Sequence, residues 1–121
     1  MEFIKNGMKK KAIIISIKGY QLSKKERSLL ANEKPWGLIL FKRNIKSLEQ
    51  IKELIKRIRK LTKDSKFPIM IDEEGVTVSR LSQIVDHNFS QKSLGDIYKI
   101  NNKIGLILYK NYINKLTIFL R

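Results

Sequence analysis

The side chains of this sequence that are best suited to bind a polar ligand or to take part in catalysis lie just past its middle. Three adjacent carboxylates, Asp72, Glu73 and Glu74, follow a short apolar run and precede Gly75. Arg80 follows a few residues later and could offer a planar set of N–H donors to a polar ligand. A plainer interpretation stays open, in which Asp72 caps a turn and the two glutamates are simply solvated.

The elements that must position these residues alternate along the chain. Runs rich in β-branched and apolar residues predict strands, and apolar residues spaced by three and four predict helices. The expected strands are Lys11–Lys18, Gly37–Phe41, Phe67–Ile71 and Leu116–Leu120. The expected helices are 24–32, 47–63 and 93–114.

Two of these helices have clear start signals. Ser23 stands three residues before Glu26, which is the spacing of a capping box. Ser47 stands three residues before Gln50 in the same way. The helix after Ser47 is expected to bury one apolar face and to present lysines and arginines on the other.

Alternating strands and helices predict an α/β fold with a parallel sheet. In such folds, ligands bind beyond the carboxyl ends of the strands. Asp72 follows one predicted strand, and Lys42-Arg43-Asn44 follows the strand before it. We therefore expect both groups to lie at the same edge of the sheet.

Composition narrows the classes of function. The 121 residues include 26 basic and 11 acidic side chains, for a net charge of +15, but no cysteine. Absence of cysteine excludes a disulfide scaffold and a thiolate zinc site. We expect no metal site and no cofactor, since one histidine leaves mainly carboxylates as ligands. So high a positive charge is typical of proteins that bind nucleic acid. However, residues 67–100, which contain the candidate site residues, carry more acidic than basic side chains. A solvated lysine surface is the favoured interpretation.

The motif Gly37-Leu38-Ile39-Leu40-Phe41-Lys42-Arg43-Asn44, followed by a basic amphipathic helix and by Ile71-Asp72-Glu73-Glu74-Gly75 with Arg80-Leu81, resembles the N-terminal part of family 3 glycoside hydrolases. It looks most like the bacterial cytoplasmic β-N-acetylhexosaminidases of cell-wall recycling. The resemblance runs from about Ile13 to Leu94. We expect a cytoplasmic protein, also because no apolar run approaches the length of a transmembrane helix.

The resemblance implies a partial TIM barrel, about the first three to four βα units of a (β/α)8 fold, with residues 1–121 as a single partial domain. It implies that Asp72 and Arg80 bind the substrate, a saccharide that contains N-acetylglucosamine, and that Glu74 is structural. This chain departs from the family pattern at Val76 and Thr77, where glycine and arginine are usual. The substrate loop is therefore expected to differ.

No catalytic residue is expected within this chain. In the resembled family the nucleophilic aspartate and the histidine proton donor come later in the barrel, and both should lie beyond position 121. Asp86 and His87 could suggest a dyad, but a solvent-exposed loop histidine is the favoured interpretation.

We therefore expect a truncated retaining β-N-acetylhexosaminidase that is inactive alone, with a complementing C-terminal fragment or self-association restoring its barrel. The alternatives are a sugar-binding remnant without hydrolysis and, less favoured, a basic nucleic-acid-binding protein. Strands such as Ile13–Ile17 and Ile69–Ile71 should leave apolar side chains uncovered, which predicts association or a loosely packed chain.

Overall fold

The computed structural model describes residues 2–5, 8–76, 78–85 and 90–120. The chain divides into two compact units, and each is described by itself. The first unit comprises Met1–Glu73 and Ser79–Asp86, and the second comprises Glu74–Val78 and His87–Arg121. Our expectation of one partial domain over residues 1–121 stays a prediction.

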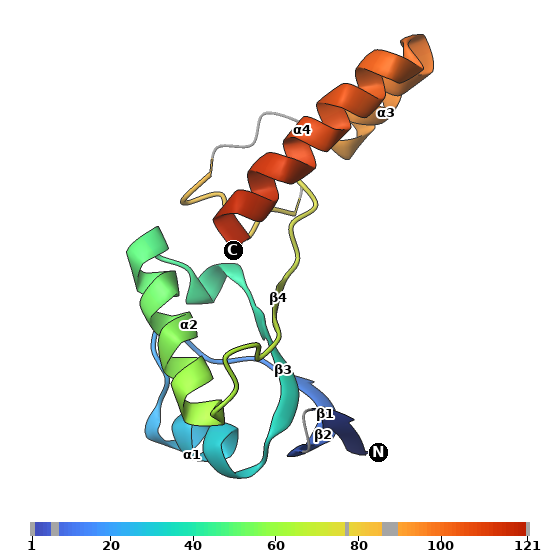
Figure 1. Ribbon diagram of the computed structural model, residues 1–121. Coiled ribbons are helices and arrows are strands. Elements are labelled where there is room, and N and C mark those ends of the chain that lie inside the picture. Colours follow the sequence, from blue (N-terminus) through green and yellow to red (C-terminus); the bar gives the residue numbers. More distant parts are fainter. Residues whose placement is uncertain (1, 6–7, 77, 86–89, 121) are drawn as a thin grey trace. The chain divides into compact units, whose positions relative to one another are not determined.

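A four-stranded sheet forms the centre of the first unit (Figure 1). Its strands are β1 (Glu2–Lys5), β2 (Met8–Ile15), β3 (Pro35–Leu40) and β4 (Ile69–Ile71), in the order β1-β2-β3-β4. Strands β2, β3 and β4 run parallel, while β1 pairs antiparallel with β2. The sequence predicted the three parallel strands but not the antiparallel β1.

Two helices connect the parallel strands and lie on the same side of β3 (Figure 1). Helix α1 (Lys24–Asn32) connects β2 to β3, and helix α2 (Leu48–Thr62) connects β3 to β4. Both predicted N-caps are confirmed, since the Ser23 and Ser47 hydroxyls accept hydrogen bonds from the Glu26 and Gln50 amides. Only α1 has the full capping box, because the Gln50 side chain accepts from Lys46 instead of Ser47.

The helices cover the sheet through an apolar core. Helix α2 buries Ile51, Leu54 and Ile58, as its apolar spacing predicted. The opposite face of α2 is basic and exposed. The main core consists of Ile17, Leu22, Leu30, Leu38, Leu40, Leu54, Ile58 and Phe67.

Part of the sheet stays uncovered. Ile13 and Ile14 of β2 are about half exposed, at 51% and 48%, and the three residues of β4 are only half-buried. The expectation of uncovered side chains over Ile13–Ile17 is met at Ile13 and Ile14 but is wrong at Ile17, which lies beyond the end of β2 and is buried in the main core. This uncovered surface would forgo hydrophobic stabilisation if nothing packs on it.

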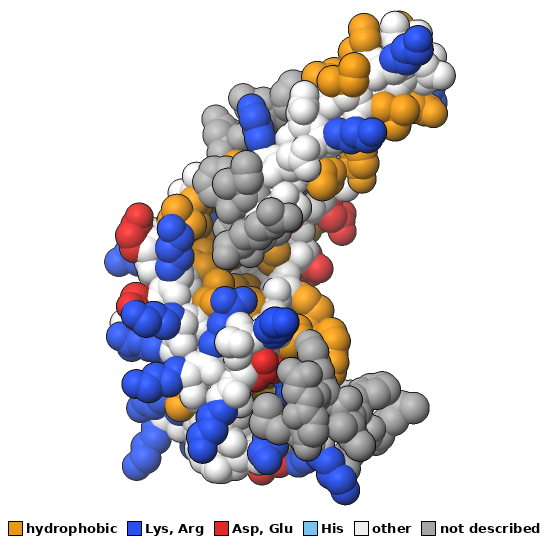
Figure 2. Space-filling model, in the orientation of Figure 1, with side chains coloured by type: hydrophobic (Ala, Val, Ile, Leu, Met, Phe, Trp, Pro, Cys, Tyr) orange, Lys and Arg blue, Asp and Glu red, His pale blue; other side chains and the backbone are white. Residues whose placement is uncertain are grey.

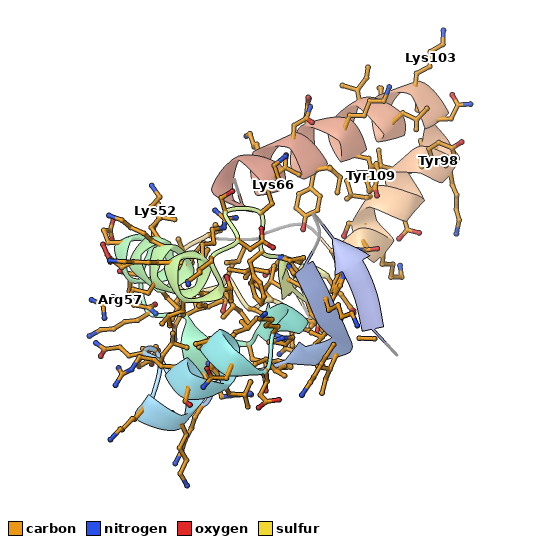
Figure 3. The ribbon with its side chains drawn as sticks, turned by 60° about the horizontal axis from the view of Figure 1, so that its bottom comes forward. Lys52, Arg57, Lys66, Tyr98, Lys103 and Tyr109 are labelled. Atoms are coloured by element: carbon orange, nitrogen blue, oxygen red, sulfur yellow. The ribbon has the colours of Figure 1, made fainter. Side chains whose placement is uncertain are left out.

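The second unit is a pair of helices, α3 (Gln91–Ile100) and α4 (Asn102–Leu120). Gly105 of α4 approaches Tyr98 of α3 so closely that a Cβ at Gly105 would lie 2.5 Å from the Tyr98 Cα. Tyr98 and Tyr109, labelled in Figure 3, extend from these two helices and are about half exposed. Among the described residues, no helix is both long and apolar enough to cross a lipid bilayer.

Two sequence predictions fail in this unit. The predicted helix 93–114 is two helices, because Asn101 adopts an extended backbone and its side-chain oxygen accepts the Ile104 amide, which starts a new helix. The predicted strand Leu116–Leu120 is wrong, because α4 continues through it. A short apolar run fits either element, and this one contains neither the glycine nor the proline that would stop a helix.

Candidate functional site

The side-chain amide of one buried asparagine joins the loops that follow β2 and β3 by hydrogen bonds. Asn44 is fully buried, and its side-chain nitrogen donates to the carbonyls of Ile17 and Gly19, both at 3.0 Å. Its side-chain oxygen accepts the Phe41 amide at 2.9 Å. Every polar atom of this side chain is therefore used within the protein. The role of Asn44 is to hold the strand ends, not to bind a ligand.

Arg43 reinforces the same junction. Its Nε donates to the Ile17 carbonyl, and one of its terminal nitrogens donates to the Ser16 hydroxyl, both at 3.2 Å. The guanidinium carbon also lies 4.6 Å from the centre of the Phe41 ring. The predicted group Lys42-Arg43-Asn44 forms a short 3-10 helix, η1 (Lys42–Asn44), that serves this junction.

Asp72 lies directly after β4, at the carboxyl end of the parallel strands. Its side chain is exposed, and its two oxygens can each accept a hydrogen bond. An exposed carboxylate at this end of a parallel sheet can bind hydroxyl groups of a ligand. The structure thus places Asp72 where the sequence predicted it.

Glu73 closes the loop that returns to Arg80. One of its carboxylate oxygens accepts the backbone amides of Arg80 and Leu81, both at 2.9 Å. Glu73 also forms an isolated antiparallel bridge with Ser79. Because these contacts span seven and eight residues, they fix where the chain re-enters the first unit. We call this arrangement the Glu73 clamp.

The clamp fixes the backbone from which the Arg80 side chain extends. The Arg80 guanidinium carbon lies 5.7 Å from the centre of the Phe41 ring, the same ring that Arg43 contacts. The Nε of Arg80 is buried and has no hydrogen-bond partner among the described residues. Because buried donors are normally paired, this nitrogen is unusual in having no partner among the described residues.

The sequence did not predict the roles of two residues of this arrangement. Glu73 forms the clamp, and the ring of Phe41 contacts the guanidinium groups of Arg43 and Arg80. The resemblance implied that Glu74 is structural, yet the Glu74 side chain is exposed. Glu73 instead makes the loop contacts. Nothing in the sequence distinguishes the two glutamates, because the difference depends on how the loop returns.

The departure from the family pattern at Val76 creates no backbone strain. Gly75 adopts the left-handed conformation, with φ at 108°. Val76 is not among the residues with positive φ, and it is exposed. The glycine that the turn requires is therefore present in this chain. Thr77, Asp86 and His87 lie outside the described residues.

The acidic side chains of the site form no metal centre. Within the described part of the chain, no group of three aspartate, glutamate or histidine side chains is placed to hold a metal ion. The chemistry available from the described residues at this edge is hydrogen bonding, by a free carboxylate at Asp72 and by a guanidinium at Arg80.

The chain is similar in sequence to β-hexosaminidases and in structure to a β-N-acetylglucosaminidase. The chain is 38% identical over 92 residues to a β-hexosaminidase of Idiomarina loihiensis, which covers 75% of this chain and 26% of that protein. It is 41% identical over 69 residues to a β-hexosaminidase of Haemophilus influenzae, or 57% of this chain and 19% of that protein. A solved family 3 β-N-acetylglucosaminidase of Paenibacillus is 27% identical over 56% of this chain and 14% of its own, with a TM-score of 0.52.

The chain resembles the β-hexosaminidases of glycoside hydrolase family 3. No protein-family model matches it. NagZ of Neisseria gonorrhoeae, solved in complex with N-trifluoroacetyl-D-glucosamine, is 28% identical with a TM-score of 0.63. That match covers 76% of this chain and 27% of the NagZ chain. The resemblance predicted from the motifs is confirmed.

The fold prediction is confirmed as well. Three parallel strands with connecting helices form an α/β arrangement like part of the family's barrel. The chain spans only 19% to 26% of the length of these two curated relatives. The activity of those full-length proteins therefore belongs to chains of which this one matches only a part.

Proposed function

We propose that this chain binds a terminal N-acetylglucosamine residue as the first part of a β-N-acetylhexosaminidase pocket. The observation that carries the proposal is Asp72, exposed at the carboxyl end of a parallel strand, with a clamped loop returning to Arg80. The solved complex of NagZ with an N-acylated glucosamine supports this class of ligand.

The two site residues have complementary roles in this proposal. The Asp72 carboxylate accepts hydrogen bonds from two neighbouring sugar hydroxyls and so fixes the orientation of the ring. Arg80 donates to the sugar through its guanidinium, whose buried Nε has no partner among the described residues. Both interactions involve a charged partner, which makes each of them stronger than a neutral hydrogen bond.

The reaction of the full family barrel is the retaining hydrolysis of a terminal N-acetylglucosamine, here from peptidoglycan fragments in the cytoplasm. Such hydrolysis needs a nucleophilic carboxylate and a proton donor on either side of the scissile bond. We assign neither role to a residue of this chain. The chain alone is proposed to bind the sugar without cleaving it, and a complementing C-terminal fragment or self-association would supply the rest.

Titration calorimetry with N-acetylglucosamine tests the binding. The wild-type chain should bind the sugar, and Asp72→Ala should weaken binding by about tenfold or more, since a hydrogen bond to a charged group contributes about 1.5–3 kcal/mol. Asp96→Ala is the control, because Asp96 is a half-exposed aspartate on α3 that pairs with Lys92. Equal binding by wild type and Asp72→Ala would refute the assignment.

A separate assay tests the absence of hydrolysis. The purified chain is incubated with an aryl N-acetylglucosaminide, and release of the aryl alcohol is followed. We expect no release above that of a buffer control. Turnover that copurifies with the chain through two chromatography steps would show that it contains its own catalytic groups.

A further inference from the structure

The first unit has a concave surface that the candidate sugar-site residues Asp72 and Arg80 do not line. A cavity of about 700 Å³ lies between α1 and α2. We call it the helix groove. Its lining comes from the segment before α1, from α1 and from α2, and includes Tyr20, Leu22, Leu54, Lys60 and Leu61. Its volume is within the range of known ligand sites, about 300–1,000 Å³.

The floor of the helix groove is apolar. Leu22 and Leu54 are buried at its base, and Leu61 is half-buried. Ala31 of α1 and Tyr20 are exposed at its margins. A ligand that fills this groove must therefore present an apolar surface of its own to gain from displacing water there.

The rim of the groove is strongly cationic. It carries Arg27, Arg57, Lys60 and Lys63 but only one carboxylate, Glu53, which lies 3.7 Å from Arg57. Lys60 and Lys63 are exposed, and neither is in an ion pair among the described residues. Figure 2 shows lysine and arginine side chains gathered over the region that α1 and α2 occupy in Figure 1, and in Figure 3 Arg57 extends outward from α2.

We propose that the helix groove is a docking site for an acidic amphipathic helix of a partner protein. Two helices that flank an apolar groove can receive the apolar face of a third helix. Carboxylates along the edges of that third helix would then face the cationic rim. The combination of apolar floor and positive rim selects a ligand that is both amphipathic and anionic.

The other possible occupants fit the groove less well. A second copy of this chain offers no acidic helix to the groove, because basic side chains outnumber acidic ones in each of the helices α1 to α4. Helix α4 is apolar but contains lysines and no aspartate or glutamate. Nucleic acid would match the charge, but its phosphate backbone has no apolar face to cover Leu54 and Leu61.

The test uses the full chain and a fluorescein-labelled helical peptide of about 18 residues, a length at which an isolated helix is marginally stable. The peptide has leucines at spacings of three and four, flanked by glutamates. Fluorescence anisotropy is measured at about 0.15 M salt, where the Debye length is about 8 Å and distant charges are screened. We expect saturable binding, abolished when the leucines are replaced by serine and weakened when the glutamates are replaced by glutamine.

A pair of matched variants locates the site. Lys60→Glu changes the charge on the rim and should weaken binding about tenfold. Lys56→Glu makes the same change on the same helix, but Lys56 does not line the groove, and we expect less than a twofold effect. Tyr20→Ser should also weaken binding by removing part of the apolar margin. Circular dichroism confirms that each variant stays folded.

Four outcomes would overturn the proposal. One is no saturable peptide binding by the wild-type chain. A second is an equal loss in Lys60→Glu and Lys56→Glu, which would indicate attraction by net charge alone. A third is undiminished binding of the serine peptide. The fourth is displacement of the peptide by a short DNA duplex that binds more tightly and loses affinity in Lys56→Glu, which would indicate a nucleic-acid face.

Discussion

The two units of this chain depend on different kinds of contact. In the first unit, apolar side chains from both helices pack on the sheet, and buried polar groups such as Asn44 and Lys10 have defined partners. In the second unit, the helices leave Ile104, Ile107 and Tyr109 about half exposed, and their closest approach is at Gly105. The comparison indicates that buried polar contacts help to determine the first unit beside its apolar core, whereas the two helices of the second unit meet most closely at a glycine.

The buried ion pair between Lys10 and Asp64 should give the largest effect. Lys10 is 4% and Asp64 is 8% exposed, and the pair joins β2 to the turn after α2. Removing one partner of a buried pair costs about 3–5 kcal/mol. Lys10→Met should therefore lower the free energy of unfolding, measured with urea, by about that amount.

The neighbouring pair between Lys11 and Glu33 is the matched control. It joins the same strand to the end of α1, but both side chains are more than half exposed. Lys11→Met should change stability little, because exposed pairs are weak. Similar losses in Lys10→Met and Lys11→Met would contradict the claim that buried polar contacts help to determine this unit.

Asn44→Ala should give the next largest effect. The change removes three side-chain hydrogen bonds in a fully buried position and leaves backbone groups without partners. Leaving buried groups unsatisfied costs about 1–3 kcal/mol each, so we expect a loss of about 3 kcal/mol in urea unfolding. Asn32→Ala, at an exposed position in α1, should cost far less. A near-zero effect of Asn44→Ala would show that the strand ends are held by other contacts.

Gly105→Ala tests the second unit. An added Cβ would lie 2.5 Å from the Cα and 2.8 Å from the Cβ of Tyr98, so α3 and α4 must move apart. Overpacking of this kind costs about 1–3 kcal/mol and should speed hydrogen exchange in both helices. At Gly95 an added Cβ meets nothing within 4 Å, so Gly95→Ala should slow exchange in α3 by improving helix propensity. Equal exchange in the two variants would mean that the close approach at Gly105 does not hold the helices together.

The capping box of α1 should give the smallest effect. Ser23→Ala removes the cap on the Glu26 amide and should cost about 1 kcal/mol. Burial of Glu26 opposes its charge, but hydrogen bonds from Ser23 and Lys18 outweigh burial and lower the pKa of this carboxyl. The stabilisation contributed by the charged Glu26 carboxylate is thus complete above the ordinary glutamate pKa. It is lost as the pH falls through the lowered pKa of Glu26.

The pH dependence can be checked with Glu26→Gln. Urea unfolding is measured for wild type and variant at a series of pH values. The difference in stability between them should shrink as the solution is acidified below the ordinary glutamate pKa. A difference that stays constant over that range would show that the Glu26 carboxylate does not contribute through its charge.

Local signals were sufficient to predict much of the first unit. Ser23 and Ser47 begin helices where the capping pattern placed them, and β3 and β4 fall within or beside the predicted apolar runs. These elements were predictable because helix caps and apolar spacing act over a few residues. The antiparallel β1 was missed because its pairing with β2 is not encoded by a comparable local pattern.

The errors lie where local patterns are ambiguous. The apolar run at Leu116–Leu120 fits a strand as well as a helix, and only the continuation of α4 decides between them. At the candidate site, Asp72 could be predicted from its place after a strand. The Glu73 clamp could not, because it depends on contacts with the amides of Arg80 and Leu81 across a loop.

The most direct test of the central claim is an NMR titration of the isotopically labelled chain with N-acetylglucosamine. The central claim is that Asp72 and Arg80 form one sugar-binding edge. The Arg80 Nε–H signal and the amide signals around Asp72 should shift together and saturate at the same sugar concentration. In Asp72→Ala the Arg80 shift should be lost. Saturable shifts confined to other parts of the chain, or an Arg80 shift that persists in Asp72→Ala, would contradict the account.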